Sequence, residues 1–314
     1  MFEQILECIK AYDTIIIHRH KNPDGDALGS QIGLCHILRE NFPEKTVFTV
    51  GDAAGRYAFM EDSTMDEVAD ETYKKALAII LDTSAKALIS DDRYTLAEKT
   101  VRIDHHIFCE EIAEIEVTDT SFESCCGLVT AFAKECGLRL TPTAAKSLYT
   151  GMITDSGRFR YDSTSSKTFL NAAHLLEQEF STNDIFRNLY ADDFSFIRLR
   201  AQFVLKIQFT DNKKVAYIYT TREEAESYGF DNFTISRGMV NVMGEIRGVD
   251  VWVNFTETEN GVLAELRSST YNINPIARKY GGGGHEKASG ATLKDRAEAM
   301  SMLNDLIAVT EENA

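Results

Sequence analysis

The sequence lacks any long hydrophobic run and any leader of the usual secretory kind. Apolar stretches such as Ala76–Leu81 are far shorter than the roughly 20 residues needed to span a bilayer. The N-terminal segment MFEQILECIK carries Glu3 and Glu7 and has no basic region ahead of an apolar one. This pattern is typical of an amphipathic helix rather than a signal peptide. We therefore expect no membrane span and no membrane partner.

The sequence also lacks C-x-x-C pairs and any cysteine spacing typical of zinc sites. The adjacent pair Cys125–Cys126 suggests redox chemistry, but no other feature of the chain supports it. Disulfides are not expected, and the thiols favour a reducing cytoplasm, where they would be buried or idle. The six cysteines are Cys8, Cys35, Cys109, Cys125, Cys126 and Cys136.

An excess of positive charge is missing as well, since the formal net charge is −16. Proteins that coat long nucleic acids are usually basic, because neutralising phosphates supplies much of their affinity. The composition therefore argues against binding of long duplexes. It permits small phosphorylated substrates, since bound cations can invert the local field.

Strand-like segments alternate with helical patterns in the first half of the chain. The apolar run Thr14–His18 precedes a loop and then the helical pattern Ala27–Glu40. Continuous apolar strands separated by helices indicate a parallel sheet covered on both faces, and hence an α/β fold. Further strands are expected at Thr46–Val50, Ala76–Asp82, Val101–Asp104 and Ile115–Val117.

The second half of the chain changes character, because its strands alternate apolar and polar residues. This pattern covers Val215–Thr220, Val249–Thr256 and Val262–Ser268, with a hairpin turn at Glu259–Gly261 between the last two. A final helix is expected at Arg296–Val309. The sequence therefore predicts a smaller α/β domain with a mixed sheet.

Between the two halves, two helical patterns follow each other from Thr182 to Lys206 with few turn residues. We interpret this stretch as a connector. The predicted organisation is a catalytic domain at 1–186, a helical linker at 187–206 and a substrate-binding domain at 207–314.

Carboxylates and histidines recur where segments of the first half end. Most of them follow an expected strand, and in open α/β sheets the carboxyl ends of strands are where ligand sites form. Each cluster alone has an ordinary explanation as a helix cap, a turn or a core residue. Their agreement across four segments favours a shared site. The residues are His20, Asp24 and Asp26; Asp82; Asp104, His105 and His106; and Asp155.

This set of side chains suits divalent metals. Carboxylates with a few imidazoles favour Mn²⁺, or else Mg²⁺, over a thiolate-bound metal. Asp82 can bridge two cations about 3.5–4 Å apart, an arrangement used for in-line attack on phosphorus. His106 can stabilise phosphoryl oxygens or protonate a leaving group, or else orient a ligand. His18, on the same strand parity as His20, is the rival ligand.

The second half contributes the glycine-rich segment GGGGHEKASG, Gly281–Gly290. Consecutive glycines let a backbone approach a ligand and aim N–H groups at an anion, although a flexible loop has the same composition. Residues 260–290 hold four Lys or Arg against two acidic residues, opposite to the chain as a whole. We therefore expect a phosphate-recognition surface there.

In order along the chain, four motifs resemble the DHH phosphoesterase superfamily: HKNPDGDALGS, LDTS, the DHH triplet and TDSGRFRY. RSS (Arg267–Ser269) with the glycine segment resembles the DHH-associated C-terminal domain of the RecJ-like branch. The resemblance covers nearly the whole chain and implies a Rossmann-like catalytic domain. Glu286 stands where that glycine motif often has proline.

The resemblance also implies residue roles. His20 and Asp24 would bind one metal, Asp26, His105 and Asp155 the other, and Asp82 would bridge them. His106 would face the substrate phosphate, and Asp104 would support the histidines. Residues of the second domain would hold a nucleotide across the interdomain cleft; they are Arg267, Ser268, Gly282, Gly283, Gly284 and His285.

A chain of this length resembles the bacterial nano-RNases of that superfamily. The expected activity is hydrolysis of very short oligoribonucleotides and of pAp (3′-phosphoadenosine 5′-phosphate). The nearest alternative is a stand-alone phosphodiesterase for cyclic di-AMP or pApA. Inorganic pyrophosphatase is disfavoured by the glycine segment, and an inactive nucleotide-binding regulator by the complete ligand set. A homodimer is left open.

Overall fold

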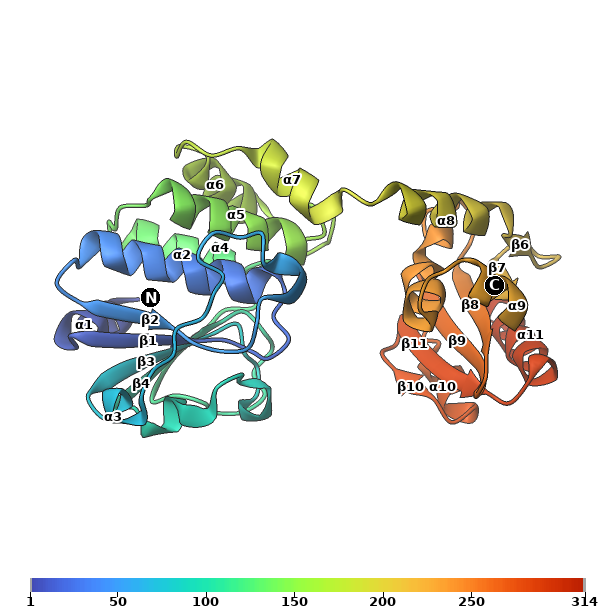
Figure 1. Ribbon diagram of the computed structural model, residues 1–314, viewed down its shortest axis with the longest axis horizontal. Coiled ribbons are helices and arrows are strands. Elements are labelled where there is room, and N and C mark those ends of the chain that lie inside the picture. The colour runs from blue at the N-terminus through green and yellow to red at the C-terminus, as the bar shows by residue number, and fades with distance from the viewer. Residues whose placement is uncertain (1, 313–314) are drawn as a thin grey trace. The chain divides into compact units, whose positions relative to one another are not determined.

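The computed structural model describes residues 2–312, which form two compact units, 2–191 and 192–312 (Figure 1). The division lies within the stretch 187–206 that the sequence suggests as a connector, between helices α7 (Thr182–Tyr190) and α8 (Phe194–Leu205). The predicted linker role of this stretch stays a prediction. No helix in the described part of the chain has the length and hydropathy needed to cross a bilayer.

The first unit is built on a five-stranded sheet in which every neighbouring pair is parallel. The strand order is β2-β1-β3-β4-β5. This confirms the predicted α/β fold, and all five expected strands are present. Their bounds are β1 Thr14–His18, β2 Thr46–Thr49, β3 Ala76–Leu81, β4 Lys99–Asp104 and β5 Ile115–Thr118.

Helices and short turns cover both faces of this sheet. Ile15 and Ile17 of β1 belong to the core cluster that contains the apolar side chains of α1, α2, α4 and α5, whereas Ile16 packs in a separate cluster with Tyr73. Burial on both faces explains why β1 and β3 are apolar throughout. The helices are α1 Glu3–Ala11, α2 Gly25–Asn41, α3 Asp70–Tyr73, α4 Cys125–Glu135, α5 Pro142–Asp155 and α6 Ser166–Leu175.

Glycines let helices α2 and α5 pack closely. A Cβ on Gly29 would lie 2.5 Å from the carbonyl oxygen of Ser147, and one on Gly25 would lie 2.5 Å from Oγ1 of Thr154. A Cβ on Gly151 would collide with the sulfur of Cys126. The start of α2 and the end of α5, each of which carries a predicted metal ligand, are therefore held side by side.

The second unit contains the predicted mixed sheet, in the order β10-β11-β9-β8-β7-β6. Only β7 and β8 pair in parallel. The expected hairpin turn joins β8 to β9, and the final helix extends to Glu312. The bounds are β6 Gln208–Phe209, β7 Val215–Thr220, α9 Arg222–Ser227, β8 Val251–Thr258, β9 Gly261–Ser268, α10 Asn274–Lys279, β10 Gly283–Gly284, β11 Ala288–Leu293 and α11 Arg296–Glu312.

Candidate metal centre

The strand order singles out one position on the edge of the first sheet. From β1 the chain moves outward to β2 on one side, and β3, β4 and β5 then extend on the other. In open α/β sheets, ligands bind at the carboxyl ends of the strands where this direction reverses. His20 follows β1 and Asp82 follows β3. Two predicted ligands therefore lie beside the point between β1 and β3 where the strand order reverses.

The start of α2 positions the first pair of carboxylates. Asp24 caps the helix, since its Oδ1 accepts hydrogen bonds from the backbone N–H groups of Asp26 (2.9 Å) and Ala27 (3.0 Å). Asp26 is buried, and its two oxygens accept the N–H groups of Cys125 (2.7 Å) and Cys126 (2.9 Å). These amides belong to the first turn of α4, where the helix dipole favours a negative charge.

Asp82 occupies the centre of the site under backbone strain. Its φ is +49°, in the left-handed region that few non-glycine residues adopt. The residue is 2% exposed, and among the described residues Oδ1 has no hydrogen-bond partner. A buried carboxylate oxygen without a donor is costly unless a cation or proton compensates it.

The two histidines face opposite oxygens of this carboxylate. His20 Nε2 lies 3.5 Å from Asp82 Oδ2 and 3.8 Å from Asp24 Oδ1. His105 Nε2 lies 3.4 Å from Asp82 Oδ1, 3.6 Å from Asp26 and 3.5 Å from Asp155. These separations are long for hydrogen bonds and leave room for an ion among the ligand atoms.

The ligand atoms fall into three groups within which all lie 4.8 Å or less apart. One group contains His20, Asp24 and Asp82, and a second contains Asp26, His105 and Asp155. The third joins Asp82, His105 and His106, so Asp82 and His105 link the first two groups. The first two groups, with two carboxylates and one imidazole each, fit Mn²⁺ or Mg²⁺. The residues present therefore fit the predicted pair of divalent cations.

Burial and charge perturb the acids of this cluster in the absence of a cation. Burial raises the pKa of Asp155 to about 6, with Asp82 and Asp24 adding to the effect and His105 opposing it. Burial also raises the pKa of Asp26 well above its usual value. For Asp82 burial acts in the same direction, but the interactions with the nearby His105 and His20 prevail and hold its pKa below the usual range.

The histidines compensate this negative charge when no metal is bound. Burial lowers the pKa of His20, but the interactions with the nearby Asp24 and Asp82 outweigh it and raise the value to about 11. For His105, burial is likewise outweighed by Asp82 and Asp26, and the pKa rises to about 10. Both imidazoles are therefore protonated at neutral pH in the metal-free protein.

Asp104 does not face the cluster but orients His106. Its Oδ1 lies 2.7 Å from Nδ1 of His106, and its Oδ2 forms an ion pair with the guanidinium of the buried Arg102. Burial alone would raise the pKa of Asp104, but His106 and Arg102 hold it below its usual value. An ionised Asp104 fixes the His106 ring so that Nε2 is the nitrogen left free.

A second buried arginine, also missed by the sequence analysis, holds the loop after β1. Arg19 donates from Nε to Gln31 (2.9 Å) and from Nη1 to Asp52 (2.9 Å) and to the carbonyl of His20 (3.1 Å). Asp52 is itself hydrogen-bonded to Ser90. Buried arginines are rare unless paired, but burial is not visible in sequence, so neither Arg19 nor Arg102 could be singled out.

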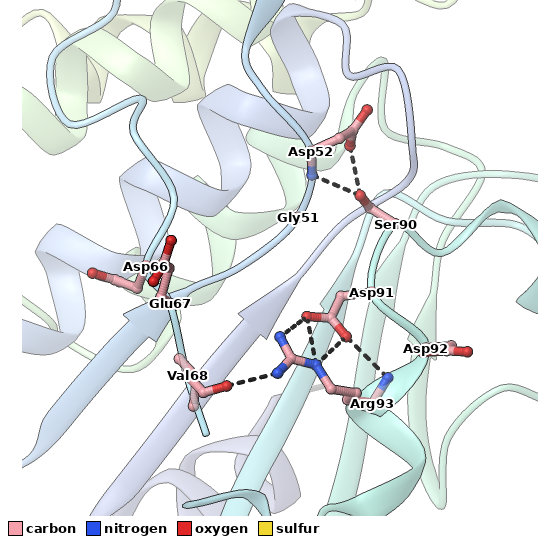
Figure 2. Close-up of a pocket in the computed structure, with 9 residues that line it drawn as sticks. All are labelled: Gly51, Asp52, Asp66, Glu67, Val68, Ser90, Asp91, Asp92 and Arg93. Carbon is pink, nitrogen blue, oxygen red and sulfur yellow. Dashed lines mark hydrogen bonds and ion pairs between the residues drawn. The ribbon is translucent and has the colours of Figure 1, made fainter. Parts of the chain in front are cut away.

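Asp52 and Ser90 also line a cavity of about 510 Å³, shown in Figure 2. Asp91 and Arg93 form an ion pair on another part of its wall. The cavity contains none of the predicted metal ligands. The rival ligand His18 is likewise separate from the cluster, since it is buried against Tyr73 and Tyr94.

Comparison with known proteins identifies the family. Residues 14–152 match the DHH family, N-terminal domain, and residues 212–312 match the DHHA1 domain. The "Bifunctional oligoribonuclease and PAP phosphatase NrnA" of Bacillus subtilis (strain 168) is 35% identical over 316 residues, which cover 100% of both chains. The chain belongs to the DHH family. The family membership that the sequence motifs predict is confirmed.

Two further relatives of this DHH-family chain extend the comparison. The "Probable bifunctional oligoribonuclease and PAP phosphatase NrnA" of Streptococcus mutans is 36% identical over 97% of both chains. The crystal structure of an exopolyphosphatase-related protein from Bacteroides fragilis has a TM-score of 0.81 and 27% identity, covering 97% of this chain and 94% of that one. The two-domain fold is thus found in a solved structure.

In the DHHA1 domain, the predicted substrate residues gather at one end of the sheet. Arg267 on β9 pairs with Ala288 on β11, which in turn pairs with β10. The guanidinium of Arg267 lies 3.2 Å from Glu265. Ser268 is buried, and its hydroxyl donates to the carbonyl of Asp250. Its proposed contact with substrate stays a prediction.

The glycine segment is more ordered than a flexible loop. Gly283 and Gly284 form β10, and a Cβ on Gly282 would lie 2.7 Å from that of Ala291. Gly284 has φ +132°, which a residue with a side chain rarely adopts. His285 is exposed beside it. Close packing explains these glycines in part, and phosphate binding by them stays a prediction.

The raised histidine pKa values predict that metal binding releases protons. We expect at least about two protons per chain, from His20 and His105, when Mn²⁺ saturates the metal-free protein at pH 7. Affinity for Mn²⁺ should increase as the pH rises towards about 10. Calorimetric titrations in buffers of different ionisation enthalpy measure the proton count.

The control is His36→Gln, since His36 pairs with Asp62 at 2.8 Å outside the cluster. This variant should release the same number of protons. A binding enthalpy independent of the buffer would contradict protonated imidazoles in the metal-free site.

Proposed function

We propose that this DHH-family protein is a metal-dependent hydrolase of phosphoesters in short nucleotides, acting both as an oligoribonuclease and as a pAp phosphatase. The observation that carries the proposal is the linkage of two ligand groups through the strained, buried carboxylate of Asp82. The names of the full-length relatives support the substrate class.

In the proposed centre, His20 and Asp24 hold one divalent cation, and Asp26, His105 and Asp155 hold the other. Asp82 contributes to both, which its geometry supports, since Oδ2 faces His20 and Oδ1 faces His105. Mn²⁺ suits this mixture of imidazole and carboxylate better than Mg²⁺, which prefers oxygen ligands and water. When bound, such cations supply Lewis acidity towards phosphate oxygens and make water a better nucleophile.

His106 is proposed to act on the substrate rather than on a metal. Its side chain is 43% exposed, and the Asp104 contact at Nδ1 leaves Nε2 directed elsewhere. The hydrogen bond to Asp104 raises the pKa of His106, which favours the protonated ring as a donor to a phosphoryl oxygen or a leaving group. Arg102 and Asp104 would act by positioning this ring.

The proposed partners are short oligoribonucleotides and small nucleotides such as pAp and pApA, and the proposed compartment is the cytoplasm. The net charge of −16 supports the exclusion of long duplexes, and six unpaired cysteines are compatible with a reducing environment. In the DHHA1 domain, Arg267 and His285 are proposed to bind a substrate phosphate or base.

A substrate panel tests the proposal directly. Purified protein with Mn²⁺ should hydrolyse pAp and a ribodinucleotide much faster than a long RNA at matched ends and salt, because an acidic surface repels an extended polyanion. Rates on pyrophosphate and cyclic di-AMP should be low. Equal rates on long and short RNA would contradict the proposal, and rapid opening of cyclic di-AMP with little action on pAp would favour the alternative.

Arg267→Ala tests the contribution of the DHHA1 domain. Losing a charged hydrogen-bond partner costs about 1.5–3 kcal/mol, or roughly 10- to 150-fold in kcat/KM on pAp and pApA. The metal content should stay normal, and a small generic phosphodiester should lose much less activity. Equal losses on both kinds of substrate would mean that Arg267 supports the fold rather than substrate binding. Its ion-pair partner in the structure, Glu265, is also on β9.

A further inference from the structure

Two arginines from distant parts of the sequence meet at the end of α7, within the first unit. Arg56 donates from Nη2 to the carbonyl of Leu189 at 3.4 Å. The guanidinium carbon of Arg158 lies 4.4 Å from the centre of the neighbouring Tyr190 ring. Consecutive residues of α7 thus hold two cationic groups close together.

Arg158 is close in sequence to a residue of the proposed metal centre. It follows Asp155 by three residues, and its N–H donates to the carbonyl of Ile153 at 2.8 Å, which closes the end of α5. Gly157, Arg158 and Phe159 all have left-handed φ angles, of 57°, 65° and 62°. Residues with side chains rarely adopt this conformation, so the turn directs Arg158 from a fixed backbone.

Tyr57 links Arg56 to the start of α2. The Tyr57 ring centre lies 5.1 Å from the Arg56 guanidinium carbon. Burial raises the pKa of the Tyr57 phenol. The positive charge of Arg56 lowers this pKa, and the negative charge of Asp24 raises it. Tyr57 is therefore within electrostatic reach of both Arg56 and the metal-binding end of α2.

Neither arginine forms an ion pair with any carboxylate among residues 2–312, although both are exposed. Some exposed arginines, such as Arg139, Arg200 and Arg222, do pair with an acidic side chain. What distinguishes Arg56 and Arg158 is that both are held at the end of α7. In a chain with 49 acidic and 33 basic residues, two unpaired guanidinium groups beside a cluster of carboxylates are free to bind an external anion.

We propose that Arg56 and Arg158 bind a substrate phosphate other than the one that is hydrolysed. The inference rests on the proposed function and adds a phosphate subsite within the catalytic unit. Guanidinium groups match phosphate oxygens bidentately, and stacking on Tyr57 and Tyr190 restricts their motion. In pAp this phosphate is the 5′-phosphate when the 3′-phosphate is removed, and in a short oligoribonucleotide it is a neighbouring phosphate.

The double variant Arg56→Ala/Arg158→Ala tests the subsite. Its KM for pAp should rise at least about 10-fold, as expected for the loss of a charged hydrogen-bond partner. The kcat should change little, because the contact is the same in the ground and transition states. Bis(p-nitrophenyl) phosphate carries a single phosphate, so its hydrolysis should lose far less. The control Arg139→Ala removes an exposed arginine at the far end of α2, near Glu40, and should match the wild type.

A competition assay tests this inference separately from the proposed function. The proposed function itself is tested by wild-type turnover of pAp. Adenosine 5′-phosphate should inhibit wild-type hydrolysis of bis(p-nitrophenyl) phosphate, and at least about 10-fold more should be needed with the double variant. Unchanged inhibition would overturn the inference. An equal weakening of inhibition by adenosine, which has no phosphate, would also overturn it and point to base stacking on Tyr190.

Discussion

The repulsion among buried and half-buried carboxylates is the constraint on which the first unit depends. Asp26, Asp82 and Asp155 lie around His105 with separations of 3.4–3.6 Å from its Nε2. Removing such charges from water is expensive unless opposite charges or donors compensate them. Backbone N–H groups of α4 donate hydrogen bonds to Asp26, but Asp82 Oδ1 has no hydrogen-bond donor among the described residues. A pair of divalent cations would supply the compensation that the protonated His20 and His105 supply in the metal-free protein.

Much of the surrounding structure can be understood as support for that cluster. Glycines on α2 and α5 allow the close helix packing that brings Asp26 and Asp155 together. Arg19 fixes the loop that carries His20, and Arg102 keeps Asp104 in place against His106. Both arginines are fully buried. Their pairing is what makes that burial tolerable, and replacing Arg102 would leave the buried carboxylate of Asp104 without its guanidinium partner.

The sequence predicts the sheet well because β1 and β3 are buried on both faces and are therefore apolar throughout. It also predicts the ligand groups, since parallel strands end at one edge and their terminal residues must meet there. Asp155 is different, because it ends a helix rather than a strand. Its place in the cluster depends on how α5 packs against α2, and tertiary packing of this kind leaves no local periodic signal.

Other features could not be read from the sequence for similar reasons. The roles of Arg19, Arg102, Arg56 and Arg158 follow from contacts between segments far apart in the chain. The left-handed turn after Asp155 was signalled only by Gly157, a residue type common at helix ends. In the DHHA1 domain, the glycines have a packing role that composition cannot distinguish from ligand binding.

The central claim is that Asp82 is shared by two divalent cations, and metal stoichiometry tests it most directly. Asn is nearly isosteric with Asp and tolerates a left-handed φ, so Asp82→Asn should fold while losing the bridging charge. Equilibrium dialysis against Mn²⁺ should give about two ions per wild-type chain, and weaker binding of both in the variant. The control Asp62→Asn, outside the cluster, should retain both ions. One ion or none in the active wild type, or full occupancy in Asp82→Asn, would contradict the account.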